Sequence, residues 1–253
     1  MAHDLTILYA DNHLVAVSKP ARIPTASDAS GDDTMLARVR RWNEERQVEG
    51  RKGYCVPIHF LDRPVSGLIL FGLSSKGASR LNEQFRQRLL SKTYIAIVHG
   101  RPPASEGRLE HYLVKDKQQN MTRITGPGHP EGKRSVLTYR VIAERAGLSW
   151  LLVNPETGRS HQIRVQLASL GTPIWGDLKY GAPEGWDGCI ALHAWQLDLK
   201  HPTGKEKFRL QAPLPESWKA VWPEPWPIET LSGVADQELT PSKSKSETVS
   251  ESK

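Results

Sequence analysis

Three stretches of the sequence contain side chains that could carry out chemistry. The first is HFLDRPVSG (59–67), in which Asp62 stands next to Arg63, between an apolar run and a proline turn. An aspartate before Arg-Pro commonly caps the amides of a turn. A carboxylate at such a place can also act as a nucleophile or a general base. Taken alone, this stretch leaves both interpretations open.

The second stretch is TGRSHQIRVQLASLGTPIWGDLKYG (157–181), which predicts a short helix over 160–170 that Ser160 can cap. His161 and Arg164 are three residues apart, so they would project to one side of this helix. Taken alone, the pair is explained as well by a solvated basic face.

The third stretch is ALHAWQLDLKHP (191–202), whose pattern predicts a strand. Leu192 and Ala194 would lie on one face of this strand and His193 on the other. A place in the core is sufficient to explain all three residues.

Other segments show the periodicity of elements that would position these stretches. A hairpin at 5–20 is indicated by two alternating apolar runs around Asp11 and Asn12. The helix expected at 74–90 would turn Ala78, Leu81, Phe85 and Leu89 inward. The remaining expectations are a helix at 32–46 and strands at 67–73, 92–99, 135–142, 148–153, 190–199 and 206–211.

The segment 115–134 is polar, contains Gly and Pro, and has an excess of three positive charges. We expect a mobile surface loop here that could clamp phosphates. Because strands and helices mix without a strict βαβ repeat, the fold class is α+β, with a mixed, largely antiparallel sheet and flanking helices. We expect one catalytic domain over 1–230 and a disordered polar tail over 231–253, where Ser, Lys, Glu and Thr dominate.

Composition limits the function classes. The formal charge is +6, or about +7 without the tail, which favours a polyanionic partner such as RNA or DNA. No apolar run is long enough to span a bilayer. The two cysteines, Cys55 and Cys189, do not have the spacing of a disulfide framework or a zinc site, which fits a reducing cytoplasm. No GxGxxG, GxxxxGK[ST] or HExxH motif is present, so neither a nucleotide cofactor nor a metal is indicated.

Taken together, the motifs resemble those of the RluA-type RNA pseudouridine synthases. The resemblance runs from about residue 5 to 213. Its motifs, in chain order, are I-L-Y-x-D-x-x-L-V-A-V-x-K-P, H-x-L-D-R-P-x-S-G, K-x-Y-x-A-x-V-x-G, T-G-R-x-H-Q-I-R and L-H-A-x-x-L. It implies a pseudouridine synthase fold with a central RNA-binding catalytic cleft.

The resemblance also implies roles for individual residues. Asp62 would be the catalytic aspartate, Tyr94 would stack on the target uracil, Arg164 would pair with the aspartate, and Leu192 would form an apolar wall. The reaction would isomerise a uridine of rRNA or tRNA without a cofactor. The carboxylate would attack C1′ or C6 as a nucleophile, or remove the 2′ proton as a base; the sequence leaves these three routes open.

The chain departs from the family pattern H-R-L-D-x-x-T-S-G at Phe60 and Val65. In relatives the arginine at the first of these positions is thought to help displace or replace the flipped nucleotide. Phe60 would either wedge into the vacated base stack or pack inward, and Arg63 would partly supply the missing charge. His161 is a further candidate for substrate binding.

Two other functions are compatible with parts of the pattern. One is a catalytically silent RNA-binding protein on the same scaffold, although Asp62, Tyr94 and Arg164 are all retained. The other is a glycosidic hydrolase, for which no second acid is convincingly placed. For either RNA function we expect a cytoplasmic protein, a monomer, with no membrane and no metal.

Overall fold

The computed structural model describes residues 5–26, 31–46, 53–204, 206–223 and 225–227. The expected polar tail at 231–253 lies outside these residues. The strands are β1 (Thr6–Ala10), β2 (Leu14–Lys19), β3 (Val56–Pro57), β4 (Ser66–Gly72), β5 (Ser91–His99), β6 (Glu106–Asp116), β7 (Met121–Thr125), β8 (Lys133–Arg145), β9 (Leu148–Pro155), β10 (Leu192–Lys200) and β11 (Lys207–Gln211). The helices are α1 (Met35–Glu45), α2 (Ser75–Gln87) and α3 (Gln162–Ala168), with short 3₁₀ turns η1 (Leu178–Tyr180) and η2 (Glu216–Ala220).

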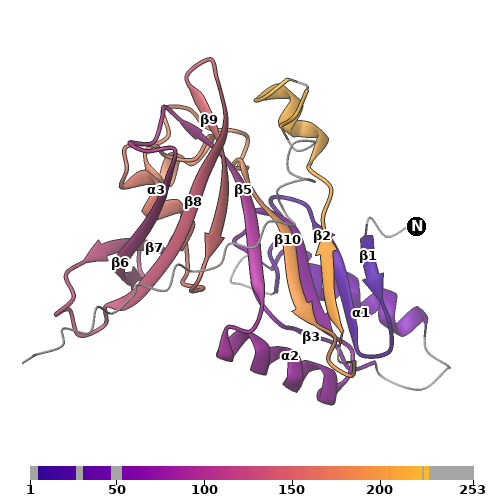
Figure 1. Cartoon of the computed structure of the whole chain (residues 1–253). Helices are drawn as coiled ribbons and strands as arrows, with labels where there is room; N and C mark the ends of the chain where they lie inside the picture. The colour runs from indigo at the N-terminus through magenta and orange to yellow at the C-terminus, as the bar shows by residue number, and fades with distance from the viewer. Residues whose placement is uncertain (1–4, 27–30, 47–52, 205, 224, 228–253) are drawn as a thin grey trace, which may run out of the picture.

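These strands form one sheet in the order β1-β2-β4-β10-β5-β9-β8-β6-β7, with β11 beside β10 and β3 beside β4. Among the described residues β4 and β10 pair in parallel, and the other strand pairs are antiparallel. In Figure 1, β6–β9 and α3 lie to the left of β5, α1 and β1–β3 lie to the right, and α2 lies below β5. The predicted α+β class with a largely antiparallel sheet is confirmed.

Helices cover both faces of the sheet at β2 and β4. On one face Met35 and Val39 of α1 join the cluster that contains Ile69 and Phe71 of β4. On the other face Leu81 of α2 packs in the cluster that contains Leu68 and Leu70 of β4. Every residue of β4 is therefore buried. This explains why 67–73 reads as a continuous apolar run instead of an alternating one.

Helix α2 is shorter than the sequence suggests. Its N-terminus is capped by the Ser74 side chain, which accepts a hydrogen bond from Gly77 N. The helix ends at Gln87, and the C-cap residue Arg88 adopts a left-handed conformation (φ 56°). Leu89 therefore lies beyond the helix and is 59% exposed, so the prediction that it faces the core is wrong.

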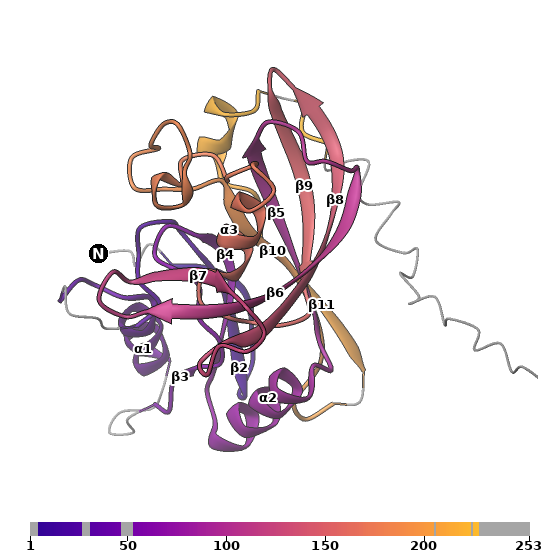
Figure 2. The same cartoon turned by 90° about the vertical axis from the view of Figure 1, so that its left-hand side faces the viewer.

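The segment 115–134 is not a mobile loop, contrary to expectation. It contains the end of β6, all of β7 and the start of β8, and β6 pairs with both neighbours. In Figure 2 these strands cross in front of the rest of the sheet. Many of their side chains face solvent, so the apolar alternation that reveals other strands is weak here, and backbone pairing maintains the structure.

The contact between β4 and β10 depends on Gly67. This residue has φ +115°, and a Cβ on it would lie 2.3 Å from the carbonyl oxygen of Ala194. The two strands pair only through His193 with Ser66 and Ala194 with Gly67. A glycine at this position lets the segment that bears Asp62 approach the start of β10.

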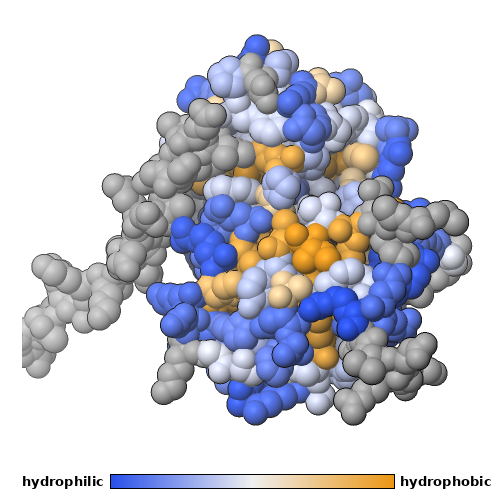
Figure 3. All heavy atoms as spheres, turned by 90° about the vertical axis from the view of Figure 1, so that its right-hand side faces the viewer, coloured by the Kyte–Doolittle hydropathy of each residue, from blue (hydrophilic) through white to orange (hydrophobic). Residues whose placement is uncertain are grey.

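The edge of the sheet at β1 lies on the side of the molecule opposite to the one that faces the viewer in Figure 2. A space-filling view of this face shows apolar side chains gathered near its centre and polar side chains around them (Figure 3). On β1, Ile7 is 38% exposed. The described residues contain no helix long and apolar enough to cross a membrane.

Candidate active site

A cleft of about 980 Å³ lies where the two halves of the sheet meet. Most of its lining comes from segments 24–26, 59–65 and 155–164, strand β5, and the start of β10, and Phe85, Lys115, Asn120, Lys179 and Gly188 complete it. All seven site residues predicted from the sequence line it. They are Phe60, Asp62, Arg63, Tyr94, His161, Arg164 and Leu192.

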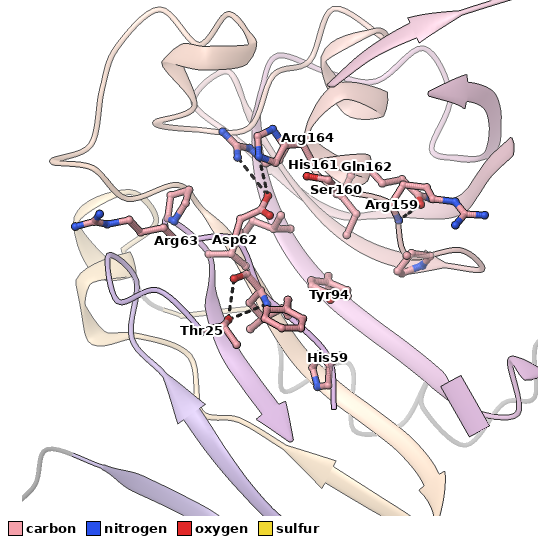
Figure 4. A pocket seen from close by; sticks show the side chains of 18 of the residues that line it. Thr25, His59, Asp62, Arg63, Tyr94, Arg159, Ser160, His161, Gln162 and Arg164 are labelled. Atoms are coloured by element: carbon pink, nitrogen blue, oxygen red, sulfur yellow. Dashed lines mark hydrogen bonds and ion pairs between the residues drawn. The ribbon is translucent and has the colours of Figure 1, made fainter. Parts of the chain in front are cut away.

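The residues that flank Asp62 are anchored on both sides. Leu61 and Val65 are buried in the core, and Thr25 Oγ1 exchanges hydrogen bonds with the backbone of Leu61, accepting from N at 3.2 Å and donating to O at 3.0 Å. A turn closes when Val65 N donates to the carbonyl oxygen of Asp62 at 3.1 Å. The Asp62 side chain, 27% exposed, is left facing the cleft (Figure 4).

A buried lysine supports this turn from beneath. Lys19 Nζ donates hydrogen bonds to the carbonyl oxygens of Pro20, Ile23 and Arg63 at 3.0, 2.7 and 3.2 Å. Burial lowers the pKa of Lys19 to about 7, although the negative charge of Asp62 acts in the opposite direction. The lysine therefore ties the first hairpin to the Asp62 segment.

Arg164 connects the Asp62 carboxylate to a second, buried carboxylate. Its Nη1 donates to Asp62 Oδ2 at 3.3 Å, and its Nε and Nη2 donate to the two oxygens of Asp177 at 2.7 and 2.8 Å. Burial opposes the charge of Arg164, but the bonds to both carboxylates outweigh it and raise the pKa of the guanidinium. The fork with Asp177 fixes the plane of the guanidinium, which directs its remaining nitrogen at Asp62.

Asp177 is the main site residue that the sequence analysis missed. It lies within the second stretch, in GDLKYG, but no motif drew attention to it. Its side chain is 1% exposed and both of its oxygens are bound by Arg164. A carboxylate held in this way has no access to a substrate, so it cannot serve as the second acid of a glycosidic hydrolase.

His161 lies close to Asp62. The sequence predicted that it would lie on the helix, but it lies just before α3. It is the N-cap residue of α3 with φ 53°, and no side chain caps this helix, so the predicted cap by Ser160 is wrong. Its Nδ1 bonds with the hydroxyl of Tyr180 at 2.8 Å, and its Nε2 is 3.8 Å from Asp62 Oδ2. Burial lowers the pKa of His161 to about 4, so the ring is neutral at pH 7.

The loop that precedes α3 is held by Gln162. Its Oε1 accepts from Thr157 Oγ1 at 2.7 Å and from Arg159 N at 3.1 Å, and its Nε2 donates to Val136 O at 3.0 Å. These bonds bring Gly158 and Arg159 to the edge of the cleft. They give a structural reason for the T-G-R-x-H-Q spacing.

Tyr94 forms part of the cleft wall on β5, opposite the Asp62 turn (Figure 4). Burial, and to a lesser degree the charge of Asp62, raise the pKa of its hydroxyl above the ordinary value. The phenol is therefore protonated at neutral pH. Its hydroxyl has no hydrogen-bond partner in the described part of the chain, so the ring and the hydroxyl are both available to a ligand. Leu192, 3% exposed, adds apolar surface.

Phe60 and Arg63 differ in how they meet the sequence expectations. Phe60 is 66% exposed at the cleft, which excludes the alternative in which it packs inward. Arg63 is directed away from Asp62 in Figure 4, because its Nε donates to Arg22 O at 3.0 Å and its Nη2 pairs with Asp32 at 2.7 Å. The positive charge of Arg63, which was expected to replace part of the missing arginine charge, is therefore already partly compensated by Asp32. In the described residues no group of three or more His, Cys, Asp or Glu side chains could hold a metal ion.

Comparison with known proteins agrees with this architecture. The family model described as RNA pseudouridylate synthase matches residues 13–169. An uncharacterized RNA pseudouridine synthase, YhcT of Bacillus subtilis, is 34% identical over 85% of this chain and 70% of its own length. The dual-specificity RNA pseudouridine synthase RluA of Escherichia coli is 31% identical over 83% of this chain and 93% of its own.

A second group of relatives extends the similarity. The tRNA pseudouridine synthase C of Haemophilus ducreyi is 31% identical over 87% of this chain and 95% of its own. Among solved structures, human RNA Pseudouridylate Synthase Domain Containing 1 superimposes with a TM-score of 0.74 at 25% identity, covering 94% of this chain and 97% of that one. Sequence, fold and cleft thus agree, and the chain belongs to the RluA-type RNA pseudouridine synthases.

Proposed function

We propose that this enzyme converts a specific uridine of ribosomal or transfer RNA to pseudouridine, with the Asp62 carboxylate as the reacting group. The observation that carries the proposal is the 3.3 Å contact between Arg164 Nη1 and Asp62 Oδ2 inside a cleft that Tyr94 also lines. The RNA class is supported by two relatives, one named as a tRNA pseudouridine synthase and the other as a dual-specificity RNA pseudouridine synthase.

The reaction breaks the bond between N1 and C1′, turns the base, and joins C5 to C1′. The proton lost from C5 is matched by one gained at N1, so the substrate and product have the same composition. No electron acceptor or activated donor is consumed, which supports chemistry without a cofactor. Asp62 would act as a nucleophile at C1′ or C6, or as the base that removes the 2′ proton.

The surroundings of Asp62 suit this role. Arg164 donates a charge-assisted hydrogen bond to the carboxylate, while Asp177 balances the charge of the same guanidinium. Because His161 is neutral, one negative charge in excess remains among the three charged groups. Tyr94 offers a ring on which uracil can stack, a contact worth about 1–3 kcal/mol. Its raised pKa supports stacking or proton donation and counts against action as an unaided base.

The decisive experiment is the replacement of Asp62 by Ala and by Asn, followed by chemical mapping of pseudouridine in RNA from cells that lack or re-express the protein. We expect at least one uridine to depend on the wild-type protein and neither variant to restore it. The reaction needs the carboxylate, and the amide of Asn is neither a nucleophile nor a base of comparable strength. Full modification by Asp62→Ala would refute the proposal.

The catalytically silent alternative has a separate outcome in the same experiment. Binding of RNA without any change in the pseudouridine map would favour it. We further propose a cytoplasmic location, which is supported by two free cysteines among the described residues, and a monomeric state. Size-exclusion chromatography with light scattering tests the monomer, and fluorescence microscopy tests the location.

A further inference from the structure

Lys92 is a cation inside the cleft for which the described residues provide no counter-charge. It precedes Tyr94 by two residues on β5, so the two side chains point to the same side of the strand. Both line the cleft, and the side chain of Lys92 is half-buried. No hydrogen bond or ion pair joins its ammonium group to any other described residue.

The surroundings of Lys92 explain this isolation. His59 stacks on Phe85 with ring centroids 5.1 Å apart, and these rings form part of the lining near the lysine. Burial, and then the charge of Lys92, lower the pKa of His59 to about 3. The neutral imidazole accepts from Leu70 N at 3.2 Å. His59 therefore supplies no negative charge to the ammonium group.

The carboxylates of the site are occupied elsewhere. Asp62 and Asp177 both bind Arg164, and the pKa of Lys92 is lowered by burial with no opposing contribution from a carboxylate. An amine that is removed from water without an anionic partner destabilises the fold. Such a cost is characteristic of groups that are kept for a ligand.

The other cations of the cleft differ from Lys92. Arg63 is bound to Asp32, Arg164 to two carboxylates, and Lys179 Nζ donates to Asn120 O at 3.1 Å. Lys115 and Arg159 are solvent-exposed. In the described part of the chain, Lys92 thus combines a position within the cleft, desolvation and the absence of a partner.

The position of Lys92 defines what it can contact. A Cβ built on Gly158 would lie 3.5 Å from Lys92 Nζ, so the ammonium group lies beside the loop before α3 where no side chain covers it. Two residues of a strand span about 7 Å. A ribose can bridge a distance of this order between a base on Tyr94 and a phosphate at Lys92.

We propose that Lys92 binds a backbone phosphate of the substrate RNA, adjacent to the uridine that lies on Tyr94. The ligand is a phosphodiester anion, which supplies the counter-charge that the described residues do not provide and makes a charge-assisted hydrogen bond. Arg159, on the far side of Gly158, extends the positive surface along which the strand leaves the cleft. The proposal deepens the proposed function and rests on it.

The test compares Lys92→Met with Lys76→Met, which removes the same charge from an exposed position on α2 outside the cleft. The probe is total RNA from cells that lack the gene, labelled with [5-³H]uridine; turnover is measured by tritium release and affinity by filter binding. For Lys92→Met we expect KM to rise about tenfold or more, as for loss of a hydrogen bond to a charged group. Lys76→Met should leave KM unchanged.

A salt titration gives a second measure. The log–log slope of affinity against salt should become shallower by about 0.7 for Lys92→Met, the loss of one phosphate contact on a single strand. Lys92→Arg, which keeps the charge, should retain most of the slope. Unchanged KM and slope in Lys92→Met, or equal changes in Lys76→Met, would overturn the proposal.

Thermal stability separates a ligand-binding lysine from a structural one. Because its ammonium group is desolvated and unpaired, Lys92→Met should melt at the wild-type temperature or higher. A marked fall in melting temperature would mean that Lys92 supports the fold, and would count against the proposal. The salt dependence of RNA binding is also measured in an Asp62→Ala background. A wild-type protein that releases no tritium refutes the proposed function, whereas the salt slope in the Asp62→Ala background still tests the phosphate contact.

Discussion

At the scale of single residues, the guanidinium group of Arg164 binds two carboxylates that differ in solvent exposure. Asp177 is buried and binds two nitrogens of Arg164, whereas Asp62 is 27% exposed and binds the third. The buried carboxylate holds the arginine in place, and the exposed one remains open to a substrate. Orientation and reactivity are therefore assigned to different side chains.

Phe60 is the residue at which this chain departs most from the family pattern. Its exposed ring at the cleft is suited to fill the gap that a uridine leaves in its stack, since apolar side chains hold unstacked base steps apart. We predict that Phe60→Arg alters RNA affinity or the choice of target more than turnover of bound substrate. Single-turnover rates at saturating enzyme, compared with filter binding, test this.

Phe60→Leu is the matched control, because it keeps an apolar side chain of smaller area. It should weaken RNA binding less than Phe60→Ala does. Equal effects of Phe60→Arg on affinity and on the single-turnover rate would contradict a role in docking.

At the scale of elements, the site depends on the contact between β4 and β10. Gly67→Ala would place a methyl group 2.3 Å from Ala194 O in a backbone conformation that only glycine adopts readily. We predict a loss of roughly 3 kcal/mol or more in the free energy of unfolding, measured by urea denaturation. Gly126→Ala is the control, because no atom lies within 4 Å of its built Cβ, and it should change stability little. A Gly67→Ala variant as stable as Gly126→Ala would show that β10 can move away.

The elements that the sequence reveals are those with one or two buried faces. The hairpin at 5–20, helix α1 and strands β5 and β9 follow from apolar periodicity, and β4 follows from its continuous apolar run. Strands β6 and β7 were missed because many of their side chains face solvent, which leaves backbone pairing as the main determinant. The end of α2 at Gln87 was missed because the expected apolar stripe continued to Leu89.

The candidate site could be predicted in part for a related reason. Residues for which we propose a role in reaction or RNA contact, such as Asp62, stand in motifs that the family resemblance identifies. Asp177 acts through a buried contact with Arg164, and Lys19, although it stands in the first motif, acts through a buried contact with the Arg63 carbonyl; the sequence pattern does not indicate either contact. The left-handed backbone conformation of His161 (φ 53°) could not be predicted either, because nothing in its sequence context indicates it.

At the scale of the whole molecule, buried histidines determine how stability responds to acid. Burial lowers the pKa of both His161 and His193 to about 4 from an ordinary value of 6.5. Between pH 6.5 and 4 the unfolded chain binds protons that the folded chain does not, so stability falls as the pH drops. Each histidine contributes up to about 1.4 kcal/mol per pH unit within this window.

His193→Gln provides the test. His193 is 1% exposed and bonds with Ser66 Oγ at 2.8 Å, so the variant should be less stable at pH 7. Its free energy of unfolding, measured by urea denaturation from pH 7 to 4, should nevertheless fall less steeply than that of the wild type, by about 1.4 kcal/mol per pH unit. An unchanged slope would show that His193 is not neutral in the folded protein.

The order of the strands has a consequence for biosynthesis. Strand β10 inserts between β4 and β5, although more than ninety residues separate its start at Leu192 from the end of β5 at His99. Asp62 and Tyr94 are therefore synthesised long before the strand that joins their two halves of the sheet. A chain still attached to the ribosome with β10 in the exit tunnel has no assembled cleft, so the enzyme cannot modify RNA until β10 has left the tunnel and paired with β4 and β5.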